Sequence, residues 1–215
     1  MSEIKGAVFD LDGVLVDTAK YHYLAWKRLA GELGFPFTER DNERLKGVSR
    51  MQSLDILLSI GGIRADEKQK QEWAEKKNIW YVDYLNTLDE NALLPGTTEY
   101  LRRLKQAGIG TALGSASKNA PFIINKLTIA PYFDAVVDGN CVSKAKPDPE
   151  IFIKCAEALA LPTGGCAVFE DSEAGIAAAK IGGMFAVGIG TREKLPHADR
   201  WAKNLQELCD ENFLL

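Results

Sequence analysis

The sequence predicts an α/β fold in which a mostly parallel β-sheet is interrupted by a helical insertion. Short apolar runs of strand length recur along the chain, and each stops at a glycine or at a group of polar residues. Such runs are typical of strands that are buried on both faces of a parallel sheet. Helical patterns separate the runs, whereas residues 17–89 contain helical patterns and no convincing strand.

Strands and helices alternate through most of the chain. The predicted strands are residues 4–9, 110–113, 134–137, 166–169 and 185–189. The predicted helices between them are residues 97–106, 150–159 and 173–181, and they start near prolines or end before glycines. We therefore expect one discontinuous α/β core domain made of residues 1–16 and 90–215.

Residues 17–89 are predicted to form a second, all-helical domain. Residues 18–33 have the pattern of an amphipathic helix, residues 39–60 indicate shorter helices, and residues 67–88 indicate a long charged helix. The aromatic residues of the long helix are interpreted as packing residues of this domain. They are Trp73, Trp80, Tyr81 and Tyr84.

Composition excludes several classes of function. The 215 residues are 46% hydrophobic, as in globular proteins, and the net charge of −4 argues against a nucleic-acid-binding protein. Four isolated cysteines and two histidines give no zinc-site spacing. The sequence has no signal-peptide pattern and no apolar window long enough to span a membrane. We expect a cytoplasmic monomer without a membrane segment.

Polar residues follow four of the predicted strands. They are Asp10 and Asp12 after the first, Ser115 after the second, Lys146 after the third, and Glu170 and Asp171 after the fourth. In open α/β sheets this edge binds ligands. Grouped carboxylates repel one another unless a cation is bound, and oxygen ligands suit Mg²⁺, which usually accompanies phosphates. The set therefore predicts phosphoryl transfer, with Ser115 and Lys146 binding the phosphoryl group.

The two aspartates after the first strand have separable roles. Asp10, as the last residue of its strand, is the candidate nucleophile that forms an aspartyl-phosphate, and Asp12 is the candidate general acid and base. Other interpretations stay open. The pair could cap a turn, the acidic residues after the fourth strand could begin a helix, and Lys144 could replace Lys146.

Three segments in this order resemble the motifs of the haloacid dehalogenase-like superfamily. They are FDLDGVLVDT over residues 9–18, Ser115 followed by Lys146-Pro147, and EDSEAGI over residues 170–176. The resemblance implies a Rossmann-like three-layer core, and it identifies the helical insertion as a cap domain. It also implies a Mg²⁺ ion that is bound by the carboxylates of Asp10, Glu170 and Asp171 and by the backbone carbonyl of Asp12.

Further residues resemble the β-phosphoglucomutases, a family within that superfamily. They are Thr18, His22, Trp26, LKGVSR over residues 45–50 and SASKN over residues 115–119. This resemblance implies interconversion of β-glucose 1-phosphate and β-glucose 6-phosphate through an aspartyl-phosphate enzyme and a β-glucose 1,6-bisphosphate intermediate. It also implies a set of substrate-binding residues.

The implied binding residues come from both domains. Arg50, Ser117 and Asn119 would bind the distal phosphate, and Ala116 would offer its amide to the transferring phosphoryl group. Other residues would face the sugar, contact Asp12 or form the hinge. They are Trp26, Lys46, and the backbone of Gly47 and Val48 at the sugar, His22 and Lys77 at the substrate or Asp12, and Thr18 at the hinge.

Two other functions remain as alternatives, namely a Mg²⁺-dependent sugar-phosphate phosphatase and a catalytically silent sugar-phosphate binder. A mutase needs a second phosphate-binding group because its intermediate carries a phosphate at each end, and Arg50 suits this role. The Asp10 and Asp12 pair argues against a silent binder. Individual cap residues also have structural interpretations: Arg50, His22 and Lys77 on a solvated surface, and Trp26 in the cap core.

Overall fold

A six-stranded parallel sheet forms the centre of the protein. The computed structural model describes residues 4–45 and 48–215, so the predicted site residues Lys46 and Gly47 lie outside the described residues. The strand order is β3-β2-β1-β4-β5-β6, and every neighbouring pair is parallel. The strands are β1 (Gly6–Phe9), β2 (Gly110–Gly114), β3 (Ala135–Val137), β4 (Cys166–Glu170), β5 (Phe185–Ile189) and β6 (Arg200–Ala202).

The sheet confirms the predicted fold class and corrects two details. Asp10 was expected to be the last residue of its strand, but β1 ends at Phe9, and Asp10 is the first residue of the loop that follows. The sixth strand, Arg200–Ala202, was not predicted. Its three residues pair with β5, and an arginine at its start interrupts any apolar run that the sequence could reveal.

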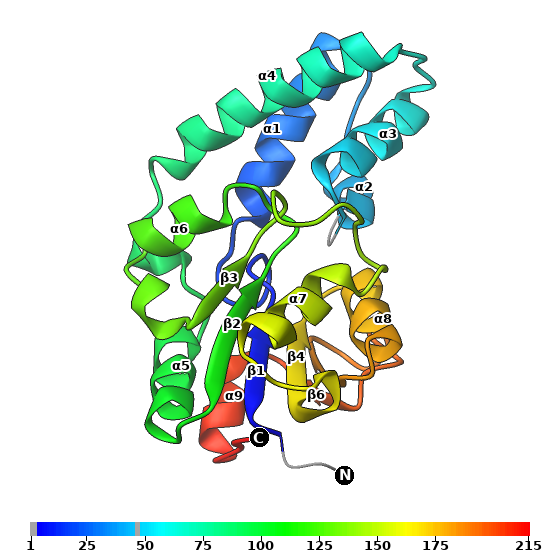
Figure 1. The fold of residues 1–215 in the computed structure, drawn as a ribbon. Helices are drawn as coiled ribbons and strands as arrows, with labels where there is room; N and C mark the ends of the chain where they lie inside the picture. Colours follow the sequence, from blue (N-terminus) through cyan, green and yellow to red (C-terminus); the bar gives the residue numbers. More distant parts are fainter. Residues whose placement is uncertain (1–3, 46–47) are drawn as a thin grey trace.

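Helices cover both faces of the sheet and make a three-layer core (Figure 1). Along β1, Ala7 and Phe9 belong to one buried cluster and Val8 belongs to the other, as the two-residue period of a strand requires. The first cluster includes residues of α5 (Thr97–Gln106), α6 (Ala120–Lys126) and α9 (Leu205–Asp210). The second includes residues of α7 (Glu150–Ala158) and α8 (Glu173–Ile181).

A second group of helices lies beyond the carboxyl ends of the strands (Figure 1). It consists of α1 (Ala19–Glu32), α2 (Glu39–Asn42), α3 (Arg50–Gly61) and α4 (Glu67–Leu85), with α4 packed against α1 and α3. Helix α4 ends three residues before the predicted Leu88. Capping boxes fix the starts of α3, through Ser49 and Gln52, and of α4, through Asp66 and Gln69.

Short 3₁₀ helices complete the described chain. They are η1 (Glu43–Leu45), η2 (Glu90–Ala92), η3 (Ala130–Tyr132) and η4 (Thr163–Gly165). The first lies within residues 39–60, where shorter helices were expected. The other three were not predicted, nor were α6 and α9, because each is shorter than the window in which a helical period becomes visible. Within the described ranges, the structure contains no helix that is long and apolar enough to cross a bilayer.

The two connections between the helical group and the sheet run side by side. Val16 and Leu93 form an isolated antiparallel bridge. The Asp17 amide donates to the Ala92 carbonyl at 2.8 Å, and the Leu94 amide donates to the Leu15 carbonyl at 2.9 Å. The chain therefore leaves the core and returns to it at neighbouring, hydrogen-bonded positions.

Candidate active site

The register of the central strands brings the predicted polar residues together. Phe9 is level with Leu113 of β2 and with Phe169 of β4, so Asp10 emerges between the ends of these two strands. The Asp10 amide donates to the Phe169 carbonyl at 3.0 Å, and the Ser115 amide donates to the Val137 carbonyl at 3.1 Å. These backbone bonds extend the strand geometry into the loops, and they fix where both side chains begin.

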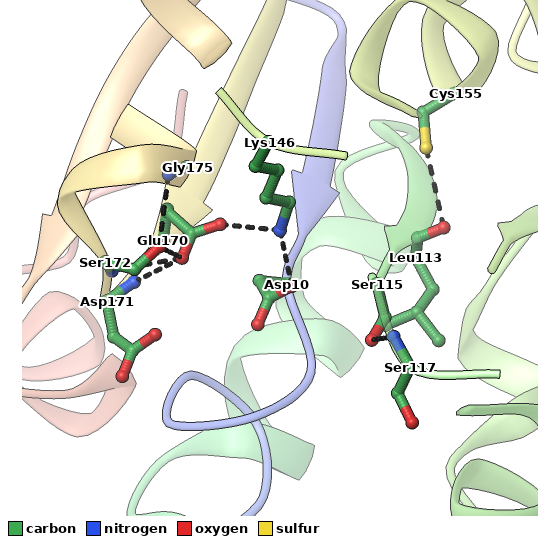
Figure 2. A network of polar contacts seen from close by, with 10 residues as sticks. All are labelled: Asp10, Leu113, Ser115, Ser117, Lys146, Cys155, Glu170, Asp171, Ser172 and Gly175. Carbon is green, nitrogen blue, oxygen red and sulfur yellow. Dashed lines mark hydrogen bonds and ion pairs between the residues drawn. The ribbon is translucent and has the colours of Figure 1, made fainter. Parts of the chain in front are cut away.

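Lys146 is the ion-pair partner of two carboxylates (Figure 2). Its ammonium nitrogen donates to Asp10 Oδ1 at 2.6 Å and to Glu170 Oε2 at 2.8 Å, and the side chain is 1% exposed. Burial disfavours its charge, but the two carboxylates outweigh burial and raise the pKa of Lys146 above its ordinary value. Lys144, in contrast, is exposed and pairs with Asp148, so Lys146 is the lysine at this site.

Glu170 is fully buried and accepts hydrogen bonds on both carboxylate oxygens. Oε1 accepts from the amides of Asp171 and Ser172 at 3.1 and 3.0 Å and from the Ser172 hydroxyl at 2.8 Å, while Oε2 accepts from Lys146. The Ser172 hydroxyl also accepts from the Gly175 amide and caps α8. A Cβ atom at Gly175 would lie 2.0 Å from the Glu170 carboxyl carbon, so only glycine fits there.

Three carboxylates form a group that fits a hard cation. Oxygens of Asp10, Glu170 and Asp171 lie within 4.8 Å of one another. Gly13 has a φ of +83°, and a Cβ there would lie 2.1 Å from Asp171 Oδ2, so this turn has room for the third carboxylate only because residue 13 is glycine.

Burial and crowding make the ionised form of this carboxylate group costly. Burial raises the pKa of Asp10 well above its ordinary value; Lys146 opposes the rise, and the neighbouring carboxylates add to it. Three carboxylates lie close together, and the Lys146 ammonium group contacts two of them. Oxygen-only donors of this kind suit Mg²⁺ or Ca²⁺ rather than a softer metal. The donor set therefore fits a bound divalent cation. The contribution of the Asp12 carbonyl stays a prediction.

Asp12 is placed to exchange a proton. The Thr18 hydroxyl donates to Asp12 Oδ1. Burial raises the pKa of Asp12 to about 6, while Lys146 and Lys77 oppose the rise. A carboxyl group whose pKa lies near neutral pH can both give and take a proton at low cost.

Lys77, which is buried, and His22, which is half-buried, form a basic pair on the helical side. Lys77 is 2% exposed, so the interpretation of a solvated face is wrong. Its nitrogen lies 3.0 Å from His22 Nδ1 and at 4.6 and 4.5 Å from the ring centroids of Trp26 and Tyr81. Burial lowers the pKa of both basic groups well below their ordinary values, and the nearby Arg50 lowers them further. An anionic ligand bound here would favour the charged forms of Lys77 and His22 and offset this effect.

Arg50 and Asn119 approach the same space from opposite sides. Arg50 is the first residue of α3, its side chain is 22% exposed, and Nη1 lies 3.5 Å from Glu75 Oε2. Asn119 follows β2 and donates from Nδ2 to Asn78 Oδ1 of α4 at 3.0 Å. This hydrogen bond joins the helical group directly to the core, and Asn78 was not among the predicted residues.

A cavity of about 200 Å³ lies between the two parts of the protein. It brings together most of the predicted site residues, namely Asp10, Asp12, His22, Trp26, Val48, Arg50, Lys77, Ala116, Ser117, Asn119, Lys146 and Asp171. Thr18, Ser115 and Glu170 are buried and are not among the residues that line it.

Asn78 and Tyr81 also line the cavity, and sequence reasoning missed both. A helical signal exists for Tyr81, which lies four residues after Lys77, a spacing that places two side chains next to each other on a helix. The one-residue step from Lys77 to Asn78 gives no such signal.

Comparison with known proteins agrees with this geometry. The model of the haloacid dehalogenase-like hydrolases matches residues 4–183. The chain belongs to this family. It is 43% identical to a β-phosphoglucomutase of Bacillus subtilis over 210 residues, which cover 97% of this chain and 93% of the relative. The crystal structure of a β-phosphoglucomutase from Clostridium difficile has a TM-score of 0.93 and 40% identity, and it covers 97% of this chain and 95% of that chain.

A phosphatase is also among the similar proteins. A phosphorylated carbohydrates phosphatase of Thermotoga maritima is 34% identical over 185 residues, which cover 84% of this chain and 82% of the relative.

Proposed function

We propose that the protein is a phosphohexomutase that interconverts β-glucose 1-phosphate and β-glucose 6-phosphate. The reaction passes through an aspartyl-phosphate enzyme and β-glucose 1,6-bisphosphate. The observation that supports this most is a single cavity with anion-binding groups on both walls, Lys146 on the core side and Arg50 on the helical side. The similarity to β-phosphoglucomutases over nearly the whole chain supports the same conclusion.

The core wall carries out the bond exchange. A carboxylate oxygen of Asp10 attacks phosphorus, the bond from phosphorus to the sugar oxygen breaks, and that oxygen takes a proton from Asp12. In the second half-reaction a hydroxyl of the sugar phosphate that accepts the phosphoryl group gives its proton to Asp12 and attacks the phosphorus of the aspartyl-phosphate. The bond from phosphorus to Asp10 breaks, and the Asp10 carboxylate is regenerated. Ser115 and Lys146 bind the phosphoryl oxygens, and the amide of Ala116 adds a further hydrogen bond.

We infer that Asp10, Glu170 and Asp171 hold Mg²⁺, with Asp12 adding its carbonyl. Bound there, the cation would neutralise charge on the phosphoryl group and on the attacking carboxylate. Glu170 is held in place for this task by its hydrogen bonds to Lys146 and to the start of α8.

The helical wall binds the phosphate that does not react. Arg50 offers a planar guanidinium group, and the amino end of α3, a helix of 12 residues, adds the positive end of its dipole. Ser117 and Asn119 line the cavity opposite it. Both ends of the bisphosphate are phosphates, so the intermediate can rebind in the reverse orientation and present its other end to Asp10.

We further propose that residues 17–89 move as a cap over a core of residues 1–16 and 90–215. Closure would exclude the water that hydrolyses an aspartyl-phosphate. Thr18 would lie at the hinge, and Lys46, Gly47, Val48 and Trp26 would contact the sugar. The protein would act on sugar phosphates as a cytoplasmic monomer, without nucleic-acid or membrane partners.

A coupled assay with β-glucose 1-phosphate tests the function. We expect glucose 6-phosphate to form only when bisphosphate or another phosphoryl donor is added to prime the enzyme. Release of inorganic phosphate at a comparable rate would instead identify the sugar-phosphate phosphatase, the alternative that the Thermotoga relative represents. The variant Asp10→Asn should abolish both activities, and surviving turnover would reject the aspartyl-phosphate.

The variant Arg50→Ala separates the two phosphate sites. It should lower mutase activity strongly and leave the hydrolysis of p-nitrophenyl phosphate nearly unchanged, because the aryl ester has no second phosphate. Arg64→Ala, at an exposed arginine beyond the carboxyl end of α3, serves as the matched control. Equal losses in both reactions would remove Arg50 from the distal site.

A further inference from the structure

The hydroxyl of Tyr81 is buried at the active site without a partner. Tyr81 lies on α4, is 1% exposed and lines the cavity. Within residues 4–45 and 48–215, its hydroxyl oxygen is one of three buried side-chain atoms without a hydrogen bond. Leaving such a group unpaired costs about 1–3 kcal/mol, so an unpaired hydroxyl in a functional cavity calls for an explanation.

The ring of Tyr81 is held from two sides, and this fixes where its hydroxyl lies. It stacks on the His22 ring with centroids 4.0 Å apart, and the Lys77 ammonium lies 4.5 Å from its centroid. Burial raises the pKa of the hydroxyl well above its ordinary value, the charge of Asp12 adds to the rise, and the neighbouring Thr18 side chain opposes it. The hydroxyl is therefore a neutral donor next to Thr18 and close to Asp12.

The hydrogen-bond capacity of Thr18 determines what this donor can do. Thr18 has one hydroxyl hydrogen, and it is donated to Asp12 Oδ1. The Thr18 oxygen can still accept, and the Tyr81 hydroxyl is the neighbouring group with a hydrogen to give. The two hydroxyls interact weakly in this structure, because hydrogen bonding to Thr18 lowers the pKa of Tyr81, but their geometry falls short of a full hydrogen bond. Hydrogen bonds at active sites often tighten only in the substrate complex.

We propose that Tyr81 is a positioning residue for Asp12 and acts through Thr18. When the cap closes, the Tyr81 hydroxyl donates to Thr18 Oγ1, which donates to Asp12 Oδ1. This chain holds one carboxylate oxygen still and leaves Oδ2 to exchange the proton with the sugar oxygen. Tyr81 and Thr18 keep their own protons throughout, because the transferred proton moves only between Asp12 and the sugar. The proposal rests on the acid–base role of Asp12 in the proposed function.

The variant Tyr81→Phe removes only the hydroxyl, and Tyr100→Phe is its matched control. Tyr100 is also fully buried with an unpaired hydroxyl, but it lies on α5 against Phe9 and Phe169 and does not line the cavity. Each variant removes an unpaired buried hydroxyl, so both should unfold at the wild-type temperature or slightly above it.

The discriminating measurement is how phosphoenzyme formation depends on the leaving group. Rapid-mixing assays would follow the first turnover with phenyl phosphate, a poor leaving group, and with p-nitrophenyl phosphate, a good one that needs little proton donation. We expect Tyr81→Phe to slow the poor leaving group about 10-fold, a part of the 10²–10⁴-fold effect of general acid catalysis, and to leave the good one within about 2-fold. The kcat of the mutase should fall by the same factor at unchanged KM.

Three outcomes would overturn the proposal: equal rates in Tyr81→Phe and Tyr100→Phe, equal losses with both esters, and full additivity of Tyr81→Phe with Thr18→Val. The aryl esters do not depend on the identity of the sugar. A wild-type enzyme that forms no glucose 6-phosphate would therefore refute the mutase assignment, and the leaving-group comparison would still decide the role of Tyr81.

Discussion

Replacing Lys146 by methionine keeps the approximate length of the side chain and removes the one ammonium group between Asp10 and Glu170. Both carboxylates are buried and lie 2.6 and 2.8 Å from that group. Removing one partner of a buried ion pair costs about 3–5 kcal/mol, because the remaining charge loses its compensation. For a chain of this length, 1 kcal/mol shifts the melting temperature by about 2–4 °C. The variant should therefore melt about 6–20 °C below the wild type in metal-free buffer.

The deficit should depend on pH and on Mg²⁺. Without Lys146, burial and the remaining carboxylates hold the pKa of Asp10 further above its unfolded value. A carboxyl group with a raised folded pKa binds protons more tightly when folded, so stability falls as pH rises from the unfolded value, near pH 4, through the folded one. The deficit should be small at about pH 4 and largest at neutral pH and above. Added Mg²⁺ should reduce it by supplying positive charge.

Thermal unfolding with and without EDTA measures these shifts, and Lys144→Met is the matched control. Lys144 lies two residues away and is exposed, and its ammonium group pairs with Asp148 at 3.3 Å. Its backbone amide donates to Glu150, a bond that the substitution leaves in place, so the variant should change the melting temperature very little. Equal melting temperatures for the two variants, or a Lys146→Met deficit that does not change with pH, would refute the argument.

Three further predictions concern other contacts. Gly175→Ala places a Cβ 2.0 Å from the Glu170 carboxyl carbon, so it should lower the free energy of unfolding by about 1–3 kcal/mol and raise the Mg²⁺ concentration needed for half-maximal activity. Gly31→Ala is the control, because a Cβ there has no atom within 4 Å, and it should not destabilise the protein. Asn78→Ala removes the hydrogen bond to Asn119 that joins the helical group to the core. The ratio of phosphate release to mutase product should therefore rise about 2- to 13-fold, the equivalent of about 0.5–1.5 kcal/mol. An unchanged ratio, or the same change in Asn86→Ala, would contradict this. Hydrogen bonds from Arg102 and Arg103 lower the pKa of Glu99 to about 2, so the stabilisation lost in Glu99→Gln should be present above the ordinary pKa and vanish as pH falls through about 2, as unfolding midpoints would show.

The elements that follow local rules could be predicted from the sequence. The long helices and five of the six strands have a clear period or a clear apolar run. Asp10 and Glu170 were identified because each comes at the end of such a run and because the carboxyl ends of parallel strands meet. The strand β6 and the helix α9 are too short to show a period or an apolar run. Packing against the neighbouring β5 and α5 holds them in place instead.

Other parts of the site depend on contacts between distant residues. The sequence left Lys144 and Lys146 as alternatives for the lysine of the site. The path of the loop after β3 selects Lys146, because it brings the Lys146 ammonium to 4.7 Å from the Phe152 ring. Tyr81 was interpreted as a packing residue. Its ring does pack, but no helical pattern could show that its hydroxyl reaches a threonine 63 positions earlier in the chain.

The hydrogen-bonded neighbours Val16 and Leu93 have a consequence for how such a protein can evolve. A segment that enters and leaves a fold at adjacent points can be lengthened, shortened or exchanged without altering the register of the sheet beneath it. The groups that break and form the phosphorus bond belong to the part of the chain that carries the sheet. Arg50, His22 and Lys77 lie in the segment that could be exchanged. Preference for a new phosphate ester can thus be acquired by exchanging this segment, provided that the new segment keeps Thr18 and Tyr81 to position Asp12.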